Sequence, residues 1–192
     1  MNFPLCPRFQ AVLFDMDGTL LDTLSDMQDA VNHILLENGW PQRTLEEIRA
    51  FVGNGAAKLM ERAITEPIAP QRFHEILVSY KDWYQAHNCV KTAPYPGIPE
   101  VLAELEKMGV KTAVVSNKPD ATTKALAEKF FPGMPALGQR DGVDPKPSPA
   151  LVAQALSDLG VRPENAVYVG DSEVDVATAL SLIHISEPTR PY

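Results

Sequence analysis

A short apolar run that ends in two aspartates constrains this chain more than any other stretch. Residues 11–14 read Ala-Val-Leu-Phe, and the chain continues Asp-Met-Asp-Gly-Thr. A continuous apolar run suits a strand that is buried on both faces of a parallel sheet. In such sheets chemistry lies just beyond the carboxyl ends of the strands, which is where Asp15 and Asp17 fall. We therefore expect an α/β fold in which these two carboxylates belong to the active site.

The two carboxylates suit a displacement at phosphorus. One carboxylate can attack a phosphorus atom and form an acyl-phosphate, which divides hydrolysis into two easier steps. The other can protonate the leaving oxygen and then activate the water that breaks the intermediate. Gly18 allows the main chain to approach a ligand closely, and Thr19 completes the turn. The alternative is a buried strand that ends in a solvated Asp-Gly turn.

Composition narrows the class of protein and its partners. The 192 residues carry a net charge of −8, which argues against a nucleic-acid partner because binding to the phosphate backbone requires a basic face. A hydrophobic fraction of 45% is ordinary for a soluble globular chain, and no run is long enough to span a bilayer. Cys6 and Cys89 fit neither a metal site nor a disulfide framework, so we expect a cytoplasmic protein. The sequence does not indicate an oligomeric state.

Residues 22–92 show helical patterns and no convincing strand. The helices are expected at residues 21–39, from 44 onward, at 56–63 and at 72–87. This pattern predicts an all-helical insert, residues 22–92, within a core made of residues 1–21 and 93–179.

A glycine-rich break, Gly53-Asn54-Gly55, leads into one of the predicted helices. Free backbone N–H groups at such a break can bind an anion, for example a carboxylate of a substrate whose phosphate lies in the core. The alternative is a helix–helix connection in which the glycines serve only the turn.

Polar residues also follow the later predicted strands. Ser116 and Asn117 come after the strand expected at residues 111–115, where a hydroxyl and an amide can donate hydrogen bonds to phosphoryl oxygens. Ser116 could instead cap the next helix. Lys146 lies between two prolines, which restrict the backbone and hold an ammonium that can bind a phosphoryl oxygen. Asp171 and Asp175 follow the strand expected at 166–169, and carboxylates are ligands that Mg²⁺ prefers.

Four sets of residues have now been described: Asp15 with Asp17, Ser116 with Asn117, Lys146, and Asp171 with Asp175. In this order they resemble the motifs of the haloacid dehalogenase-like hydrolases, whose members are mostly phosphatases. Residues 15–23, Asp-Met-Asp-Gly-Thr-Leu-Leu-Asp-Thr, are similar to the first motif, and the resemblance extends from about residue 9 to residue 179. It implies a doubly wound parallel sheet with an inserted helical cap over the active site. The Gly-Asn-Gly break and the Ser-Asn-Lys-Pro segment at 116–119 resemble the phosphoglycolate phosphatase branch in particular.

The resemblance also implies roles for individual residues. Asp15 is expected to be the nucleophile and Asp17 the general acid and base, while Ser116 and Lys146 bind the phosphoryl group. Mg²⁺ is the expected cofactor. Its expected ligands are the side chains of Asp15, Asp171 and Asp175 and the backbone carbonyl of Asp17. Asp175 could instead orient Ser172 or Lys146. The residues expected to contact the substrate are Gly18, Thr19, Gly53, Asn54, Gly55 and Asn117.

The resulting hypothesis is a Mg²⁺-dependent phosphatase that acts on a small phosphorylated metabolite, with 2-phosphoglycolate as the first candidate. Asp17 argues against a dehalogenase, because displacement at carbon needs no acid at that position. Alternatives within the family are another small phosphate ester or pyrophosphate as substrate, or a sugar-phosphate mutase. An alternative from a different class is an inactive metal-binding interaction module.

The last residues do not continue the pattern that precedes them. Residues 173–179 begin an amphipathic helix, but residues 180–190 have no helical period. This peptide resembles the translation of a sequencing-library adapter, and such scars are excluded from fold reasoning. We expect residues 180–192 to be a non-native read-through tail and the last core strand of the family to be missing, which would expose the strand at 166–169 as a sheet edge.

Overall fold

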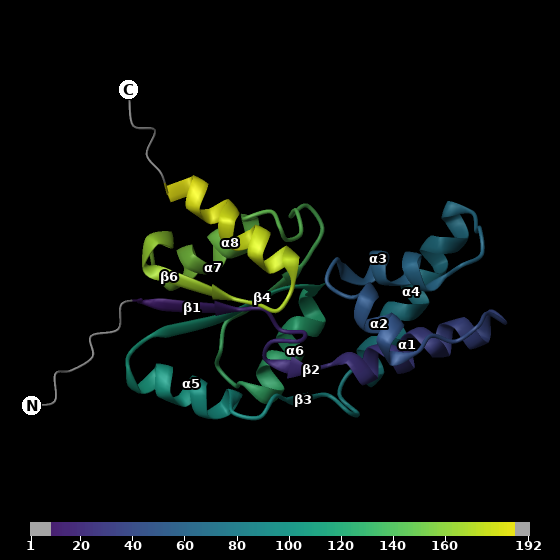
Figure 1. The fold of residues 1–192 in the computed structure, drawn as a ribbon, viewed down its shortest axis with the longest axis horizontal. Coiled ribbons are helices and arrows are strands. Elements are labelled where there is room, and N and C mark those ends of the chain that lie inside the picture. Colours follow the sequence, from purple (N-terminus) through teal and green to yellow (C-terminus); the bar gives the residue numbers. More distant parts are fainter. Residues whose placement is uncertain (1–8, 187–192) are drawn as a thin grey trace, which may run out of the picture.

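The computed structural model describes residues 9–186, and its centre is a four-stranded parallel sheet (Figure 1). The strand order is β5-β4-β1-β6. Leu13 in β1 is paired with Ala113 on one side and with Tyr168 on the other, so β1 is an interior strand. The strands are β1 (Ala11–Phe14), β4 (Lys111–Pro119), β5 (Ala136–Gln139) and β6 (Ala166–Val169).

Helices cover both faces of this sheet (Figure 1). Val12 and Phe14 of β1 pack with Leu126 of α6 on one face, whereas Leu13 packs with Leu151 of α7 on the other. Every position of β1 is therefore buried, which is why the strand has no polar residue. The predicted doubly wound parallel sheet is confirmed. The covering helices are α5 (Ile98–Lys107) and α6 (Asp120–Phe130) on the first face, and α7 (Ala150–Leu159) and α8 (Glu173–Ser186) on the second.

Four further helices form a separate unit beside the carboxyl ends of the strands, which we call the cap (Figure 1). They share an apolar core of their own, to which each helix contributes buried side chains such as Ile34, Ile48, Met60 and Tyr80. The Thr44 hydroxyl accepts from the Glu47 N–H, and the Glu47 carboxylate accepts from the Thr44 N–H. The cap helices are α1 (Leu24–Glu37), α2 (Leu45–Phe51), α3 (Gly55–Ala63) and α4 (Pro70–His87).

Two short crossings join the cap to the core. β2 (Leu21–Asp22) carries the chain out and pairs antiparallel with β3 (Ala93–Pro94), which carries it back. Asp26, in the first turn of α1, is 1% exposed. Its carboxylate accepts hydrogen bonds of 2.8 to 3.1 Å from the backbone N–H groups of residues 90–92 and from the Thr92 hydroxyl. One buried carboxylate therefore ties the two crossings together.

The structure differs from the sequence-based expectations most clearly at the ends of three elements. β4 continues to Pro119, beyond the expected residues 111–115. The first cap helix begins at Leu24 and not at residue 21, because Leu21 and Asp22 pair with β3. α8 continues to Ser186, although its apolar residues lack a helical period. Polar and apolar residues are mixed around this helix and not gathered on separate faces, and Val176 and Leu180 of α8 are exposed.

Some expectations lie outside the residues that the structure describes. Cys6 and residues 187–192 are among them, so the interpretation of residues 180–192 as a non-native tail stays a prediction. Within residues 9–186, no helix combines the length and apolar character that crossing a membrane requires.

Removal of the Asp26 carboxylate tests its role at the crossings. Asp26→Ala leaves the N–H groups of residues 90–92 without their acceptor, and we expect the free energy of unfolding to fall by about 3 kcal/mol. Asp29→Ala, one turn further along α1, removes only an exposed ion pair with Lys91 and should cost less than about 1 kcal/mol. Urea denaturation measures both values. Equal losses in the two variants would contradict this account.

Candidate active site

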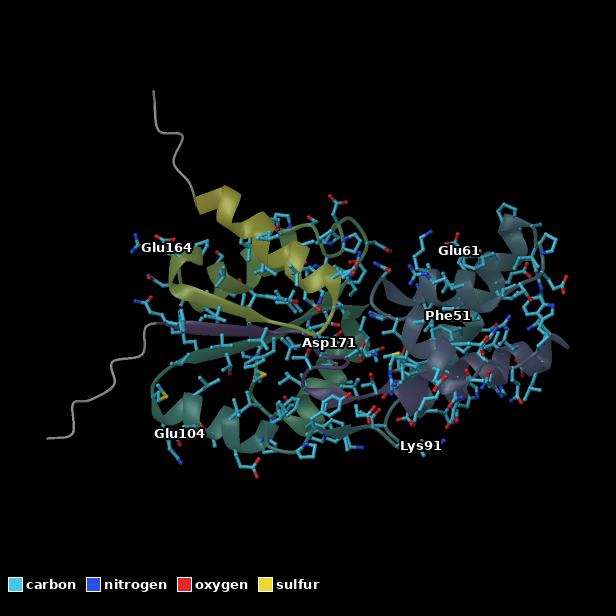
Figure 2. All side chains as sticks on the ribbon, in the orientation of Figure 1. Phe51, Glu61, Lys91, Glu104, Glu164 and Asp171 are labelled. Carbon is cyan, nitrogen blue, oxygen red and sulfur yellow. The ribbon has the colours of Figure 1, made fainter. Side chains whose placement is uncertain are left out.

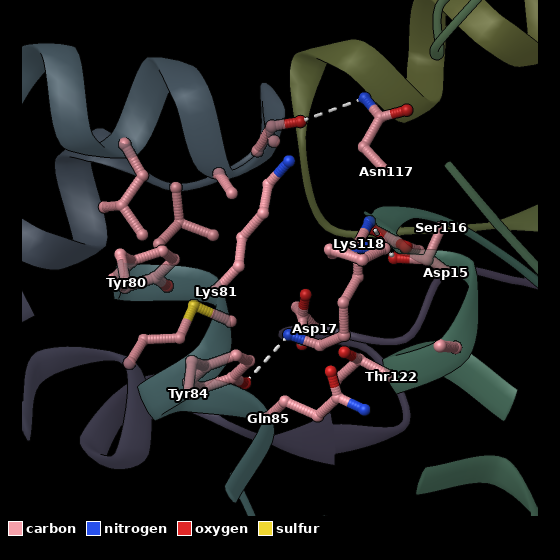
Figure 3. Close-up of a pocket in the computed structure, with 18 of the residues that line it drawn as sticks. Asp15, Asp17, Tyr80, Lys81, Tyr84, Gln85, Ser116, Asn117, Lys118 and Thr122 are labelled. Carbon is pink, nitrogen blue, oxygen red and sulfur yellow. Dashed lines mark hydrogen bonds and ion pairs between the residues drawn. The ribbon is translucent and has the colours of Figure 1, made fainter. Parts of the chain in front are cut away.

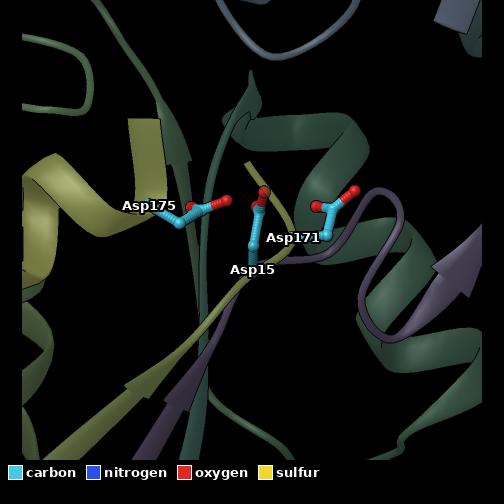
Figure 4. Close-up of side chains that lie close together, drawn as sticks. All are labelled: Asp15, Asp171 and Asp175. Atoms are coloured by element: carbon cyan, nitrogen blue, oxygen red, sulfur yellow. The ribbon is translucent and has the colours of Figure 1, made fainter. Parts of the chain in front are cut away.

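Polar side chains from separate strands meet at the carboxyl edge of the sheet. Asp171 lies at the end of the core that faces the cap, whereas Glu164 lies at the far end (Figure 2). Figure 4 shows the carboxylates of Asp15, Asp171 and Asp175 side by side, with Asp15 in the middle. One carboxylate oxygen from each of these residues lies within 4.8 Å of the corresponding oxygens of the other two. This cluster can hold a metal ion with oxygen ligands.

Lys146 supplies a positive charge in contact with this cluster. Its side chain is buried, and its Nζ lies 3.0 Å from Oδ1 of Asp15 and 2.7 Å from Oδ1 of Asp175. Asn117 holds the lysine's backbone in place, because its side chain accepts from the Lys146 N–H at 2.7 Å and donates to the Lys146 carbonyl at 3.0 Å. The lysine of the loop after β5 is therefore fixed by β4 and faces the residue that follows β1.

The same surroundings act differently on the two carboxylates that contact Lys146. Burial raises the pKa of Asp15 to about 6, although the nearby Lys146 charge acts in the opposite direction. Burial also pushes the pKa of Asp175 upward, but the charge and hydrogen bond of Lys146 and the hydrogen bonds of Ser172 outweigh it and hold that pKa below its usual range. Asp175 therefore stays ionised beside Lys146 to lower pH than a free aspartate would.

The contacts of Asp175 match the alternative in which it orients its neighbours. Its Oδ1 accepts from Lys146, and its Oδ2 accepts from the Ser172 hydroxyl at 2.5 Å and from the Ser172 N–H at 3.1 Å. Asp171 differs, because it is exposed and accepts a long hydrogen bond of 3.4 Å from the Thr19 hydroxyl. Asp15 and Asp171 are therefore better placed than Asp175 to offer oxygens to a cation.

Gly18 supports the position of Asp171. Its φ angle is +81°, and a Cβ atom at Gly18 would lie 2.3 Å from Oδ2 of Asp171. A side chain at this position would collide with the carboxylate, so only glycine allows the close approach. In this structure Gly18 and Thr19, which the sequence suggests as substrate contacts, both act on Asp171.

Asp17 lies on the cap side of Asp15 and has two close partners. The Thr23 hydroxyl donates to its Oδ1 at 2.7 Å, and Nζ of Lys118 lies 3.0 Å from the same oxygen. Lys118 also donates to the hydroxyl of Tyr84 in α4 at 2.8 Å, as the dashed line in Figure 3 shows. Burial raises the pKa of Tyr84 well above its usual value, so this phenol is neutral. Lys118 therefore joins Asp17 of the core to the cap.

Sequence reasoning did not single out Lys118 as a functional residue. Only 6% of it is exposed, although lysine is almost never buried without a partner. The available signal was its position, two residues after Ser116 at the end of an apolar strand. Its partner Tyr84 is in helix α4, 34 residues away along the chain, and could not be deduced from local pattern.

A cavity of about 570 Å³ lies between the cap and the core. Figure 3 shows Tyr80 and Tyr84 of the cap on one side of it and Ser116 and Asp15 of the core on the other. The core therefore supplies the polar end of the cavity, and the cap supplies a more apolar wall. The cap residues at the cavity are Met27, Arg49, Val52, Gly53, Gly55, Ala56, Leu59, Tyr80, Lys81, Asp82, Tyr84 and Gln85.

The Gly-Asn-Gly break contacts the core at this cavity. Gly53 and Gly55 line it, and the Gly53 carbonyl accepts from the Asn117 side chain at 3.3 Å (Figure 3). Asn54 is exposed, and its side-chain oxygen accepts from Arg62 at 2.9 Å. The break thus brings two glycines to the cavity, whereas the Asn54 side chain binds within the cap.

Comparison with known proteins identifies the family. Residues 12–182 match the family model of the haloacid dehalogenase-like hydrolases, and the chain belongs to this family. It is similar to the phosphoglycolate phosphatase of Pseudomonas putida, with 35% identity over 178 residues that cover 88% of this chain and 64% of the relative. It is also similar to the N-acetylmuramic acid 6-phosphate phosphatase of Pseudomonas aeruginosa, with 33% identity over 172 residues that cover 88% of this chain and 76% of the relative.

A solved structure agrees with this assignment. The crystal structure of a predicted phosphoglycolate phosphatase from Haemophilus somnus has a TM-score of 0.84 and 27% identity, and the match covers 92% of this chain and 83% of that one. The resemblance predicted from the four motifs is thereby confirmed at the level of family and fold. The chain spans 64% of the length of the Pseudomonas putida phosphoglycolate phosphatase.

A pair of glycine variants tests the contact between Gly18 and Asp171. Gly18 and Gly133 have φ angles of +81° and +82°, but a Cβ atom at Gly133 would meet nothing within 4 Å. Both alanine variants should lose about 1 kcal/mol of stability from backbone strain. Only Gly18→Ala should also weaken the binding of a divalent cation, by about tenfold or more, because it displaces Asp171. Calorimetric titration measures this affinity, and an equal effect of both variants would contradict the assignment.

Proposed function

We propose that the chain is a phosphomonoester hydrolase that works through an aspartyl-phosphate on Asp15. The observation that carries this proposal is the setting of Asp15. It lines the cavity together with Asp17 and Asp171, and it contacts the ammonium of Lys146. The names of two relatives, both phosphatases, support it. A carboxylate in such a setting can attack phosphorus while the charge that develops on the phosphoryl oxygens is balanced from several sides.

Asp15 is held for in-line attack. Its Oδ1 accepts from the Met16 N–H at 2.7 Å and lies 3.0 Å from the Lys146 ammonium, so the carboxylate has a fixed orientation. A pKa of about 6 leaves Asp15 ionised, and hence nucleophilic, at neutral pH. The Ser116 hydroxyl lines the same cavity and donates to the phosphoryl oxygens.

Asp17 acts as the general acid and then as the general base. In the first step it gives a proton to the oxygen of the leaving alcohol as the bond between phosphorus and that oxygen breaks. In the second step it takes a proton from the water that attacks the aspartyl-phosphate, which releases phosphate and restores Asp15. The cavity between cap and core gives the leaving group its place and limits access of bulk water to the intermediate.

The acidic cluster fits Mg²⁺. Asp15 and Asp171 would provide oxygen ligands, with Asp175 close by, and hard oxygen donors are what this cation requires. When bound, Mg²⁺ supplies further positive charge to the phosphoryl group. Asp175 orients Lys146 and Ser172, which keeps the ammonium directed at Asp15.

The substrate is a small phosphorylated metabolite, and 2-phosphoglycolate is the first candidate because of the similarity to phosphoglycolate phosphatases. A second candidate is a sugar phosphate, since a cavity of about 570 Å³ exceeds what a glycolate leaving group fills and one relative is an N-acetylmuramic acid 6-phosphate phosphatase. We expect the reaction to take place in the cytoplasm, which agrees with the free thiol of Cys89.

Phosphate release from a panel of esters tests the proposed activity. We expect the chain to hydrolyse 2-phosphoglycolate in the presence of Mg²⁺, and Asp15→Asn to lower the rate by about a thousandfold or more because it removes the nucleophile. Asp158→Asn, an exposed change on α7, is the control for loss of a carboxylate and should leave the rate unchanged. The proposal fails if Asp15→Asn retains activity, or if the folded wild-type chain releases phosphate from no ester.

The pH dependence of Mg²⁺ affinity tests the environment of Asp15. A proton and a cation compete for this carboxylate, so a pKa of about 6 predicts full affinity above about pH 7 and a loss of about tenfold per pH unit below pH 6. An ordinary aspartate would show this loss only below about pH 4. Calorimetric titration at several pH values makes the measurement. Constant affinity from pH 7 to pH 5 would contradict the raised pKa.

A further inference from the structure

We propose that Lys118 selects the substrate by binding a carboxylate on the leaving group, so that the site favours phosphate esters of 2-hydroxycarboxylic acids. This inference rests on the proposed phosphatase activity and adds a residue and a substrate class to it. Its basis is the position of one buried ammonium at the cavity, between the general acid and the cap.

Lys118 lies on the leaving-group side of the cavity. It comes two residues after Ser116 in β4, and both residues line the cavity. They lie in the last part of β4, where its pairing with β5 shifts register between Val115 and Pro119. If the phosphoryl group binds at Ser116 and Asp15, the leaving alcohol extends toward Lys118 and the cap. Figure 3 shows the Lys118 side chain reaching from the core toward Tyr84, with Asp17 beside it.

The ammonium of Lys118 retains capacity for one more partner. An ammonium has three N–H donors. Within residues 9–186, the polar partners of Nζ are Oδ1 of Asp17 at 3.0 Å and the hydroxyl of Tyr84 at 2.8 Å, and the Tyr84 ring centroid is 4.6 Å away. The residue is 94% buried, being 6% exposed, yet it borders the cavity. Asp17 provides one carboxylate to this buried charge, and the remaining N–H donor can bind an anionic group that enters the cavity.

Asp17 does not need Lys118 to be held in place. The Thr23 hydroxyl already donates to its Oδ1 at 2.7 Å, and Thr23 is itself buried at the start of α1. Burial of the Lys118 ammonium costs desolvation energy, and a second hydrogen bond to Asp17, which already has one, returns only part of that energy. The position of the charge is explained more directly by an anionic group of the substrate.

The geometry sets where that anionic group must be. A general acid lies about 2.6 to 3.2 Å from the ester oxygen to which it gives its proton. Because Nζ of Lys118 lies 3.0 Å from Asp17, the ester oxygen and the ammonium are both neighbours of the same carboxylate. A carboxylate on the carbon next to the ester oxygen can therefore reach Lys118 with a charge-assisted hydrogen bond. Phosphate esters of 2-hydroxy acids have this arrangement, and simple sugar phosphates do not.

The test compares two esters with two carbons each, on the full chain with Mg²⁺ present. 2-Phosphoglycolate has the carboxylate, and ethyl phosphate has a methyl group in its place. We expect Lys118→Met to lower kcat/KM for 2-phosphoglycolate by about thirtyfold more than kcat/KM for ethyl phosphate, with the additional loss chiefly in KM, because any effect that passes through Asp17 is common to both esters. Lys118→Arg should recover part of the loss. Lys124→Met, which removes an exposed lysine of α6, should change neither value.

Equal losses on both esters would show that Lys118 acts only through Asp17 and would overturn the proposal. Tyr84→Phe provides a second variant should Lys118→Met fold poorly, because it removes a partner of the ammonium and keeps the charge; it should impair 2-phosphoglycolate more than ethyl phosphate. Hydrolysis of both esters by the wild type with equal kcat/KM would refute the selection but leave the phosphatase function intact.

A binding measurement separates this inference from the proposed function. If the wild-type chain hydrolyses neither ester, the proposed function is wrong, but calorimetry can still compare how tightly 2-phosphoglycolate and ethyl phosphate bind. Tighter binding of 2-phosphoglycolate that disappears in Lys118→Met supports a carboxylate site at this lysine. Equal binding of the two esters, or none, would overturn it.

Discussion

The buried ammonium of Lys146, which lies between Asp15 and Asp175, is the interaction on which the rest of the site depends. Parallel strands bring several carboxylates to one edge of the sheet, where their charges repel and burial disfavours ionisation. Lys146 balances this charge at distances of 3.0 and 2.7 Å. Loss of one member of a buried ion pair leaves an uncompensated charge, which is far more costly than loss of a surface pair. The position of this lysine therefore constrains β4 and the loop after β5, because Asn117 binds its backbone.

A second buried lysine repeats this arrangement on the cap side. Lys146 contacts Asp15 from the core, while Lys118 contacts Asp17 and reaches Tyr84 in the cap. In the proposed function, the phosphoryl chemistry and the selection of the leaving group would fall to different lysines, one beside Asp15 and one beside Asp17. Asp26 holds together the crossings that connect cap and core, so the wall of the cavity keeps its position relative to the polar end.

Much of the fold follows from local sequence. β1 and β6 have the predicted bounds because each is an apolar run with a polar ending, and the start of α2 is fixed by the capping box of Thr44 and Glu47. β2 could not be predicted in this way, since two residues form a strand only when a partner from distant sequence lies beside them. α8 was predicted too short, because its apolar and polar residues are not gathered on separate faces and so give no helical period.

The same distinction holds for the candidate active site: local patterns identify some of its residues, whereas contacts between distant elements decide the rest. Asp15, Asp17, Ser116, Lys146 and Asp171 could be chosen from sequence because each follows an apolar strand or a restrained loop, and parallel strands bring such ends together. The choice between two roles for Asp175 depended on the directions of Ser172 and Lys146, which spacing does not give. Lys118 was missed because its partners, Asp17 and Tyr84, come from other elements.

Transfer of the phosphoryl group to Asp15 is the central claim, and it can be observed directly. The chain is mixed with 2-phosphoglycolate and Mg²⁺, quenched with acid within the first turnover, digested and analysed by mass spectrometry. The account predicts a phosphoryl group on the peptide that contains Asp15, which appears before free phosphate and disappears as the substrate is consumed. Free phosphate produced with no phosphorylated peptide at any time, or a phosphoryl group on a different residue, would contradict it.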